Sequence, residues 1–493
     1  MELIRIHPSD NVAVALTDIA KGSVKTVDGI EVTFLDEVKR GHKVALFDIA
    51  AGSPVIKYGF SIGNAKENIA KGSWVHVHNL KTGLGELLEY HYDKVETPDV
   101  HKEPATFNGY VRSDGKVGIR NEIWIIPTVG CVNGPAEMIA KLSNQKLPEG
   151  VDGVYAFPHP FGCSQLGEDH ENTKKLLAGL VRHPNAAGVL VLGLGCENNT
   201  IEQFKAAIGT WDDDRVKFLI CQEVEDEISE GVKIVEGLMS YAASFKRQKV
   251  DASHLVIGLK CGGSDGLSGI TANPLVGRLS DMLVAQGGTT LLTEVPEMFG
   301  AETILMNRAV NEEVFEKTVN LVNGFKDYFI RHGQVVYENP SPGNKAGGIS
   351  TLEDKSLGCT QKGGTSAVVD VLDYGDSVTK KGLNLLKGPG NDLVAATALT
   401  SAGAHIVLFT TGRGTPFGAP APTAKIATNS ALAQKKRDWI DFNAGVLVEG
   451  KTMDEVSADF FDFVLKLASG ELKTKNEQHD CRGIAIFKDG VML

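Results

Sequence analysis

The chain has 493 residues, of which 42% are hydrophobic and 23% are charged, and its formal net charge is −12. This length predicts two or three domains, and the acidic balance, without any Lys/Arg block, argues against nucleic acid as the main partner. No apolar run reaches the roughly 18 residues needed to cross a bilayer, and the opening MELIRIHPSDNV lacks the apolar core of a signal peptide. The seven cysteines are scattered without a Cys-x-x-Cys pair. We therefore expect a cytoplasmic protein with reduced thiols and a small-molecule substrate.

The first 90 residues contain an internal echo. Residues 18–23, 48–53 and 68–73 read DIAKGS, DIAAGS and NIAKGS, and each is followed by a β-prone segment. Short strands separated by Gly-Ser turns predict a small, mostly β module over residues 1–90. Residues 91–107 are polar, contain two prolines and show no apolar period, so we predict a linker there.

In residues 108–493, apolar runs alternate with helix-like segments. The expected strands lie at 123–126, 154–157, 189–192, 216–220, 255–259, 290–293 and 406–409, and the expected helices at 136–144, 173–182, 226–245, 311–331 and 395–401. This alternation predicts an α/β region with a mainly parallel sheet covered by helices on both faces. The region has room for two subdomains, the second including a Gly-rich run at 338–365 that we expect to be a long ordered loop.

Several of these strands end in polar or thiol-bearing residues. The run VLVLGLGCENN over 189–199 shows the pattern, and PTVGC, HPFGC and LKCGG repeat it. Because the carboxyl ends of parallel strands share one edge, we expect one rim to carry Cys163, Cys196, Glu197, Lys260, Cys261, Glu294, Glu297 and Arg413. The alternative for each cysteine is a small buried hydrophobe.

Such a rim suits metal-assisted chemistry on an anionic substrate. Carboxylates, histidines and thiols favour iron or manganese over magnesium, while Lys260, Lys345, Lys355 and Arg413 are suited to hold a carboxylate. The chain lacks a Gly-x-x-x-x-Gly-Lys-Ser/Thr motif, a full dinucleotide fingerprint and a Gly-x-Ser-x-Gly elbow. In the N-terminal module, His76 and His78 would point to the same face of a strand, where they could share a metal or be merely solvated.

The motifs GIRN at 118–121, PTVGCVN, HPFGCSQLGEDH, GLGCENN, CGGSDGLSGITANPLVGR, TEVPEMFGAE and TTGRGTPFGAPAPTAKIATN, with the run at 338–365, resemble the altronate/galactarate dehydratase family along the whole chain. The N-terminal module, with its His-x-His-Asn, resembles the β-clip (SAF) domain that begins those enzymes. The resemblance implies a cytoplasmic, dimer-forming, iron-dependent hydro-lyase with an unusual Rossmann-like large domain. The HVHNLKTGL region and the ending AIFKDGVML favour D-altronate as substrate, with 2-dehydro-3-deoxy-D-gluconate as the product in hexuronate catabolism.

Site roles follow as hypotheses. Removal of the C2 proton needs a base, and departure of the C3 hydroxyl an acid, while a metal stabilises the enediolate. We expect catalytic groups at His159, Lys260 and Glu297, substrate contacts at Arg120, Asn121, Lys345, Lys355 and Arg413, and Fe(II), or else Mn(II), at His76, His78, Cys163, Cys196 and Glu197.

Three alternatives stay open. An Fe–S cluster could be held by Cys163, Cys196 and Cys261, although their spacing matches no recognised cluster pattern. The substrate could be galactarate. The chain could also be a sugar-acid-binding protein without turnover.

Overall fold

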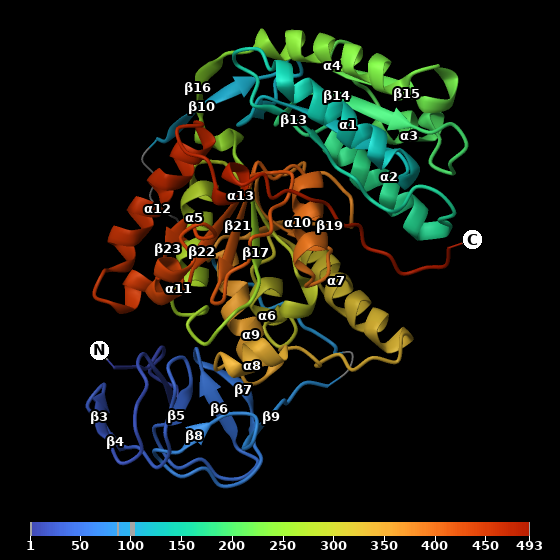
Figure 1. Ribbon diagram of the computed structural model, residues 1–493. Helices are drawn as coiled ribbons and strands as arrows, with labels where there is room; N and C mark the ends of the chain where they lie inside the picture. Colours follow the sequence, from blue (N-terminus) through green and yellow to red (C-terminus); the bar gives the residue numbers. More distant parts are fainter. Residues whose placement is uncertain (1, 86–87, 99–103, 493) are drawn as a thin grey trace.

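A computed structural model describes residues 2–85, 88–98 and 104–492. Its three parts follow one another in Figure 1: a β module at the bottom, a large sheet in the middle and a smaller sheet at the top. The α/β fold with a small β-clip module and a mainly parallel sheet covered by helices is confirmed. None of the helices among the described residues is long and apolar enough to cross a membrane.

The N-terminal module is built from short antiparallel strands. Its sheets have the orders β1-β2-β5-β8, β3-β4 and β6-β7-β9. The bounds are Leu3–Ile4 (β1), Val12–Ala15 (β2), Val24–Val27 (β3), Ile30–Thr33 (β4), Lys43–Ala45 (β5), Pro54–Lys57 (β6), Phe60–Ala65 (β7), Trp74–Val75 (β8) and Leu80–Lys81 (β9).

The three repeats of the DIAKGS type form turns with the same glycine conformation. Gly22, Gly52 and Gly72 all have φ between 80° and 87°, in the left-handed region where glycine has no Cβ penalty. Each donates its N–H at 2.8–2.9 Å to a backbone carbonyl that lies in, or directly after, another strand. At Gly72 an added Cβ would lie 2.0 Å from a carbonyl oxygen, so this turn requires glycine.

The segment that follows the module packs against the large domain. The Tyr90 hydroxyl donates to Glu302 at 2.5 Å and the Tyr92 hydroxyl to the Ala309 carbonyl at 2.5 Å. A three-stranded sheet then forms from Thr106–Val111 (β10), Val117–Gly118 (β11) and Arg247–Asp251 (β16).

The smaller parallel sheet has the order β13-β12-β14-β15. Its strands are Glu122–Pro127 (β12), Gly153–Ala156 (β13), Ala186–Gly193 (β14) and Val216–Ile220 (β15), and its helices are Asn133–Ser143 (α1), Gly167–Val181 (α2), Ile201–Ile208 (α3) and Glu227–Ala243 (α4).

The larger parallel sheet has the order β19-β20-β18-β17-β21-β22-β23. Its strands are Val256–Cys261 (β17), Thr289–Leu292 (β18), Val368–Leu372 (β19), Gly382–Leu386 (β20), Ile406–Thr411 (β21), Thr423–Ala427 (β22) and Phe442–Asn443 (β23). Its helices are Ala272–Ala285 (α5), Glu302–Met306 (α6), Glu312–Arg331 (α7), Pro342–Ala346 (α8), Leu352–Cys359 (α9), Asp392–Ser401 (α10), Ser430–Lys435 (α11), Met453–Ala468 (α12) and Lys475–Gln478 (α13).

Two core clusters contain strands of the larger parallel sheet. One packs β17, β18 and β21 against α5, α7 and α12. The other contains Leu291 and Val407 of the larger sheet together with Trp124 and Val189 of the smaller one, and α2 packs on α10 within it. The two α/β parts therefore share a buried core.

Two expectations need correction. The predicted strands fall into two sheets, so the polar strand ends form two edges and not one rim. The Gly-rich run at 338–365 is also not one long loop, because it contains α8, α9 and a 3-10 helix at Thr360–Gly363. Ser341 and Asn344 form a capping box for α8, and the Thr351 hydroxyl caps α9 by accepting from the Asp354 N–H.

Candidate active site at the carboxyl edge of the seven-stranded sheet

The strand order places a topological switch point between β17 and β21. From β17 the chain continues on one side through β18, and it returns to the other side of β17 as β21. Ligands bind beyond the carboxyl ends of parallel strands at such points. Lys260 and Cys261 end β17, and Arg413 follows β21, so three residues of the predicted rim lie there.

Lys260 is a fully buried ammonium at this edge. Its Nζ donates to the Cys261 carbonyl at 2.7 Å and the Gly390 carbonyl at 3.1 Å, and it pairs with Glu294 and, at 3.0 Å, with Asp392. Burial alone would lower its pKa, but Glu294 and Asp392 raise the pKa above its ordinary value. Lys260 therefore stays protonated, which suits an electrostatic or acid role and not that of a base.

A group of two thiols and one carboxylate lies beside it. The Sγ atoms of Cys261 and Cys359 are 3.4 Å apart, and Glu297 Oε2 is 3.2 Å from the first and 3.1 Å from the second. The possible ligand atoms of Cys261, Glu297 and Cys359 all lie within 4.8 Å of one another, which is close enough for the three side chains to bind one metal ion. Lys362 Nζ lies 3.1 Å from Cys261 Sγ, and Lys355 Nζ lies 2.8 Å from Glu297 Oε1.

The charged side chains around the two thiols are equal in number and opposite in sign. Burial tends to raise the pKa of Glu297, but Lys355 and then Lys260 lower it to about 2. The hydrogen bond with Cys261 and burial raise the pKa of the Cys359 thiol well above its usual value. Three ammonium groups then face three carboxylates: Lys260, Lys355 and Lys362 against Glu294, Glu297 and Asp392.

Glu294 is held in a strained backbone conformation. Its φ of 68° and ψ of 55° lie in the left-handed region, which costs a non-glycine residue roughly 1–3 kcal/mol. The carboxylate accepts the Cys261 N–H at 2.9 Å and pairs with Lys362 at 3.4 Å. The strain directs this carboxylate to both the backbone and an ammonium of the site.

The N-terminal module covers the site through α9. Asp354 in α9 pairs with Lys43 at 2.8 Å and Lys57 at 2.9 Å, and all three side chains are buried. The cavity between this ion cluster and the thiols, bordered by Lys57, Asp354, Lys355 and Cys359, measures about 10 Å³. The edge is therefore closed in this structure.

The two predicted metal histidines do not lie on a strand. The strand β8 ends at Val75, and residues 76–79 form a turn in which the His76 carbonyl accepts from the Asn79 N–H at 3.1 Å. Both rings pack on Trp74, with centroids 5.2 Å away for His76 and 4.9 Å for His78. His76 is buried, whereas His78 is exposed.

His76 has a free nitrogen. Its Nδ1 is buried without a hydrogen-bond partner, and burial, followed by the charge of Lys43, lowers its pKa to about 4. The neighbouring His42, 5.1 Å away ring to ring, accepts from Trp74 Nε1 at 3.1 Å and lies 3.3 Å from the Ala346 carbonyl. His76 is therefore a neutral imidazole close to α8.

The predicted substrate residues Lys345 and Arg413 lie on the same side. Lys345 is half-buried in the last turn of α8. Arg413 is exposed, and its Nη1 donates to the Gly343 carbonyl at 3.1 Å. Lys355 lies behind them, donating to Asn344 Oδ1 at 3.3 Å. Lys345, Lys355 and Arg413 are thus joined through α8 and α9, which lie beside the N-terminal module in Figure 1, and Lys355 reaches Glu297 at the sheet edge. His76 approaches α8 through His42, whereas no printed contact joins His78 to these residues.

Arg120 and Asn121 lie elsewhere, in the interior between the two α/β parts. Arg120 is 1% exposed, pairs with Glu477 through Nε at 2.6 Å, and gives Nη1 to the Ile119 and Leu467 carbonyls. The Asn121 amide donates to two carbonyls and accepts from Arg112. Both residues support the fold, and neither presents a group to the candidate site.

The remaining predicted residues belong to the four-stranded sheet. His159 is buried with Nε2 2.8 Å from the Pro127 carbonyl, and its Nδ1 accepts from the Phe161 N–H. Glu197 accepts from the Thr128 hydroxyl and from the N–H groups of Leu194 and Gly195, all within 3.0 Å. Cys163 and Cys196 lie at this second edge, apart from Cys261.

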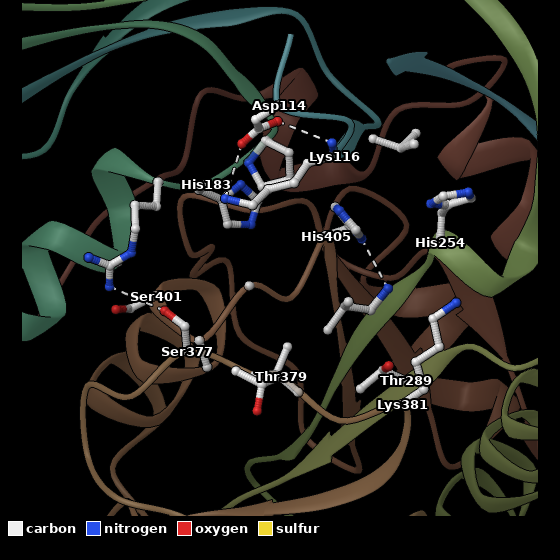
Figure 2. Close-up of a pocket in the computed structure, with 18 of the residues that line it drawn as sticks. Asp114, Lys116, His183, His254, Thr289, Ser377, Thr379, Lys381, Ser401 and His405 are labelled. Carbon is white, nitrogen blue, oxygen red and sulfur yellow. Dashed lines mark hydrogen bonds and ion pairs between the residues drawn. The ribbon is translucent and has the colours of Figure 1, made fainter. Parts of the chain in front are cut away.

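A cavity of about 540 Å³ opens at the opposite, amino edge of the seven-stranded sheet. Figure 2 shows its lining, which includes His183, His254, Thr289, Lys381 and His405. His183 and His405 are neutral because burial lowers the pKa of each. None of the site residues predicted from the sequence lines this cavity.

Sequence reasoning missed several members of the site. Cys359, Lys362 and Asp354 lie within the Gly-rich run, which the sequence predicts to be a long ordered loop and from which only Lys345 and Lys355 are predicted site residues. The signal was present, because KSLGCTQKGG places a thiol three residues before a lysine. The spacing alone could not show that this thiol meets Cys261.

Comparisons with known proteins cover the whole chain. Residues 1–83 match the family model "Altronate/galactarate dehydratase SAF domain", residues 109–243 match "D-galactarate dehydratase/Altronate hydrolase, second domain", and residues 252–492 match "D-galactarate/Altronate dehydratase, C-terminal".

Three curated relatives are similar over nearly their full length. The chain is 55% identical to altronate dehydratase of Escherichia coli (strain K12), covering 100% of both chains, and 55% identical to altronate dehydratase of Bacillus subtilis (strain 168), covering 99% of both. It is 36% identical to the L-threo-forming galactarate dehydratase of Escherichia coli, covering 96% of this chain and 94% of that one.

Proposed function

The chain belongs to the altronate/galactarate dehydratase family of hydro-lyases, and we propose that it converts D-altronate to 2-dehydro-3-deoxy-D-gluconate. The observation that carries the choice of substrate is the identity of 55% to two altronate dehydratases, against 36% to a galactarate dehydratase. The buried cationic cluster at the switch point supports an anionic substrate.

The reaction needs positive charge where the substrate carboxylate becomes an enediolate. Lys260, Lys355 and Lys362 supply three ammonium groups in a buried setting, where their field on developing negative charge is stronger than in water. Lys345 and Arg413 lie nearer the surface and are placed to hold the carboxylate and hydroxyls.

We assign the proton transfer at C2 to His76. Its imidazole is neutral, and its Nδ1 has no hydrogen-bond partner. Because the cavity at the edge measures only about 10 Å³, a six-carbon acid needs the N-terminal module or the segment of α8 and α9 to move aside. The module would then act as a cover that carries the base.

The family's iron fits the group of Cys261, Glu297 and Cys359. Two sulfurs and a carboxylate oxygen suit a divalent transition metal. Because uptake of a divalent cation with loss of two thiol protons leaves the charge of the cluster unchanged, the surrounding ion pairs are compatible with it. A bound iron would supply Lewis-acid stabilisation of the enediolate.

The expected setting is hexuronate catabolism by a homodimer in the cytoplasm. All seven cysteines are free, which supports a reducing compartment.

Anaerobic turnover of D-altronate, followed by NMR of the 2-keto product with Fe(II) and again with chelator, tests the proposal. We expect product only with iron, and slower turnover of galactarate. Faster turnover of galactarate would overturn the choice of substrate, and binding of altronate without product would favour a regulatory role. Chelator-resistant turnover would exclude a freely exchanging iron.

A further inference from the structure

Three neighbouring strands of the four-stranded sheet are each followed by a Gly-Cys pair. Gly130-Cys131 follows β12, Gly162-Cys163 follows β13, and Gly195-Cys196 follows β14. Since β13, β12 and β14 are adjacent and parallel, the three pairs lie at the same edge of the sheet.

Hydrogen bonds join the three loops that carry these pairs. The Gly130 N–H donates to the Phe161 carbonyl at 2.9 Å, and the Asn199 N–H donates to the Gly162 carbonyl at 3.0 Å. The Ser164 N–H donates to Asn198 Oδ1, also at 3.0 Å. Each loop is thus held by one of its neighbours within two residues of its cysteine.

The glycines allow this close approach. Gly162 has φ of 98°, and a Cβ there would lie 1.9 Å from the Thr128 carbonyl oxygen. Gly195 has φ of 125°, and a Cβ there would lie 2.7 Å from the Gln222 side chain. Glycine at both positions is therefore a steric requirement of bringing the three loops together.

Two of the three thiols at this edge are exposed. Cys131 and Cys196 are exposed and Cys163 is half-buried, in contrast to the buried Cys261 and Cys359. The contacts of Cys163 and Cys196 are weak, at 3.8 Å to the Ser164 hydroxyl and 3.6 Å to the Gln222 amide. Cys131 and Cys196 are therefore not packed as small hydrophobes, whereas Cys163 also contacts the core cluster of this sheet.

The Glu197 carboxylate at this edge already accepts hydrogen bonds from the surrounding loops. Burial tends to raise the pKa of Glu197, but the Thr128 hydroxyl and the Gly195 N–H lower it below its usual value. Glu197 therefore fixes the turn that presents Cys196. A fourth cysteine, Cys221, follows β15 directly after Ile220, so it lacks the glycine that precedes each of the other three. The three Gly-Cys pairs therefore supply the candidate ligands.

We propose that Cys131, Cys163 and Cys196 hold an iron–sulfur cluster of the [4Fe–4S] type, each losing its thiol proton to bind one iron. Soft thiolates select such clusters. The three sulfurs do not all lie within 4.8 Å of one another, so they are not gathered around a single ion. In a cluster each thiolate binds a different iron, and such close spacing is not required. The fourth iron would have no protein ligand and would be open to a small oxygen ligand.

This site replaces the cluster considered from the sequence. Cys261 belongs to the other sheet and is paired with Cys359, whereas Cys131 completes the set. The proposal does not depend on the substrate or on the site at Cys261, Glu297 and Cys359.

The test is anaerobic purification followed by iron and acid-labile sulfide analysis, with absorption near 400 nm. The full chain should contain about four irons and four sulfides in this site after reconstitution with iron and sulfide. Cys131→Ser, Cys163→Ser and Cys196→Ser should each lose the sulfide and the absorption, while circular dichroism and elution volume confirm folding. Cys359→Ser and Cys481→Ser are matched controls that should retain both.

A reconstituted chain without acid-labile sulfide would overturn the proposal, as would a folded Cys131→Ser variant with full sulfide. Binding of zinc or a single iron in place of a cluster would also contradict it. Iron-dependent turnover by a protein without acid-labile sulfide would contradict the cluster and support the proposed dehydration. A protein that contains the sulfide but does not turn over altronate would support the cluster and contradict the proposed dehydration.

Discussion

The ammonium of Lys43 in the N-terminal module lies 2.8 Å from the carboxylate of Asp354 in α9, and both side chains are 0% exposed. Lys57 pairs with the other oxygen of the same carboxylate at 2.9 Å. A single acid on the large domain therefore fixes two cations of the small module, directly above the thiols of the candidate site.

Asp354→Asn should undock the N-terminal module. The substitution leaves two buried ammonium groups without their carboxylate, which costs about 3–5 kcal/mol. We expect a lower melting temperature and faster proteolysis within residues 88–98. Asp376→Asn is the matched control, because its ion pair with Lys175 at 3.7 Å is exposed, and it should change stability by less than about 1 kcal/mol. Equal stability of the two variants would contradict the docking role.

The ion pair between Arg120 and Glu477 should make the free energy of unfolding decrease at low pH. Burial tends to raise the pKa of Glu477, but Arg120 lowers it to about 2 from an ordinary value of 4.5. The pair then contributes on the order of 3 kcal/mol above pH 4.5, and this contribution is lost as pH falls from about 4.5 to 2. Urea unfolding of the full chain and of Glu477→Gln over this range measures the difference. The gap between them should be large at pH 6 and nearly closed at pH 2.

Removal of one thiol should remove the metal from the proposed catalytic group. Loss of a residue that only hydrogen-bonds to a metal ligand weakens metal binding by roughly 10–100-fold. Because Cys359 is itself a proposed ligand, Cys359→Ser should weaken iron binding by more than this, and turnover should fall with it. Since bound thiols must lose their protons, affinity should rise by about one log unit per pH unit for each ionising thiol. The raised pKa of Cys359 extends this rise above neutral pH. Iron titration of the variant and the parent checks both points, and pH-independent binding would exclude these thiols as ligands.

Substitution of His76 should lower turnover much more than substitution of His78. His76→Gln removes the neutral imidazole with the free Nδ1, so kcat should fall by about 10²–10⁴-fold with iron content unchanged. His78→Ala is the companion variant, and its exposed side chain predicts a change of only a few fold. If both variants lost iron, the two histidines would be metal ligands, as the sequence suggested, and the base would have to be sought elsewhere.

The echo of DIAKGS in the first 73 residues and the alternation of apolar runs with helical segments predicted the β module and the parallel sheets, because both depend on local periodicity and turn chemistry. The apolar runs at 255–259 and 406–409 also predicted that Lys260, Cys261 and Arg413 follow strands that end at one edge, and the structure places β17 and β21 side by side. Their spacing could not show that Cys163 and Cys196 end strands of a different sheet. Sequence also could not separate Arg120, whose donors are all used inside the fold, from Arg413, which is exposed.

By itself the sequence determined the class of fold, the family and the residue types at the strand ends, since these follow from patterns a few residues long. Only the tertiary structure decided which of those residues meet. Strand order brings Cys261 to Cys359, 98 positions apart in the chain, and sets Cys131 on the same edge as Cys163 and Cys196. Contacts of this kind depend on how whole elements pack, because a strand's hydrophobic pattern states that it is buried and not which strand lies beside it.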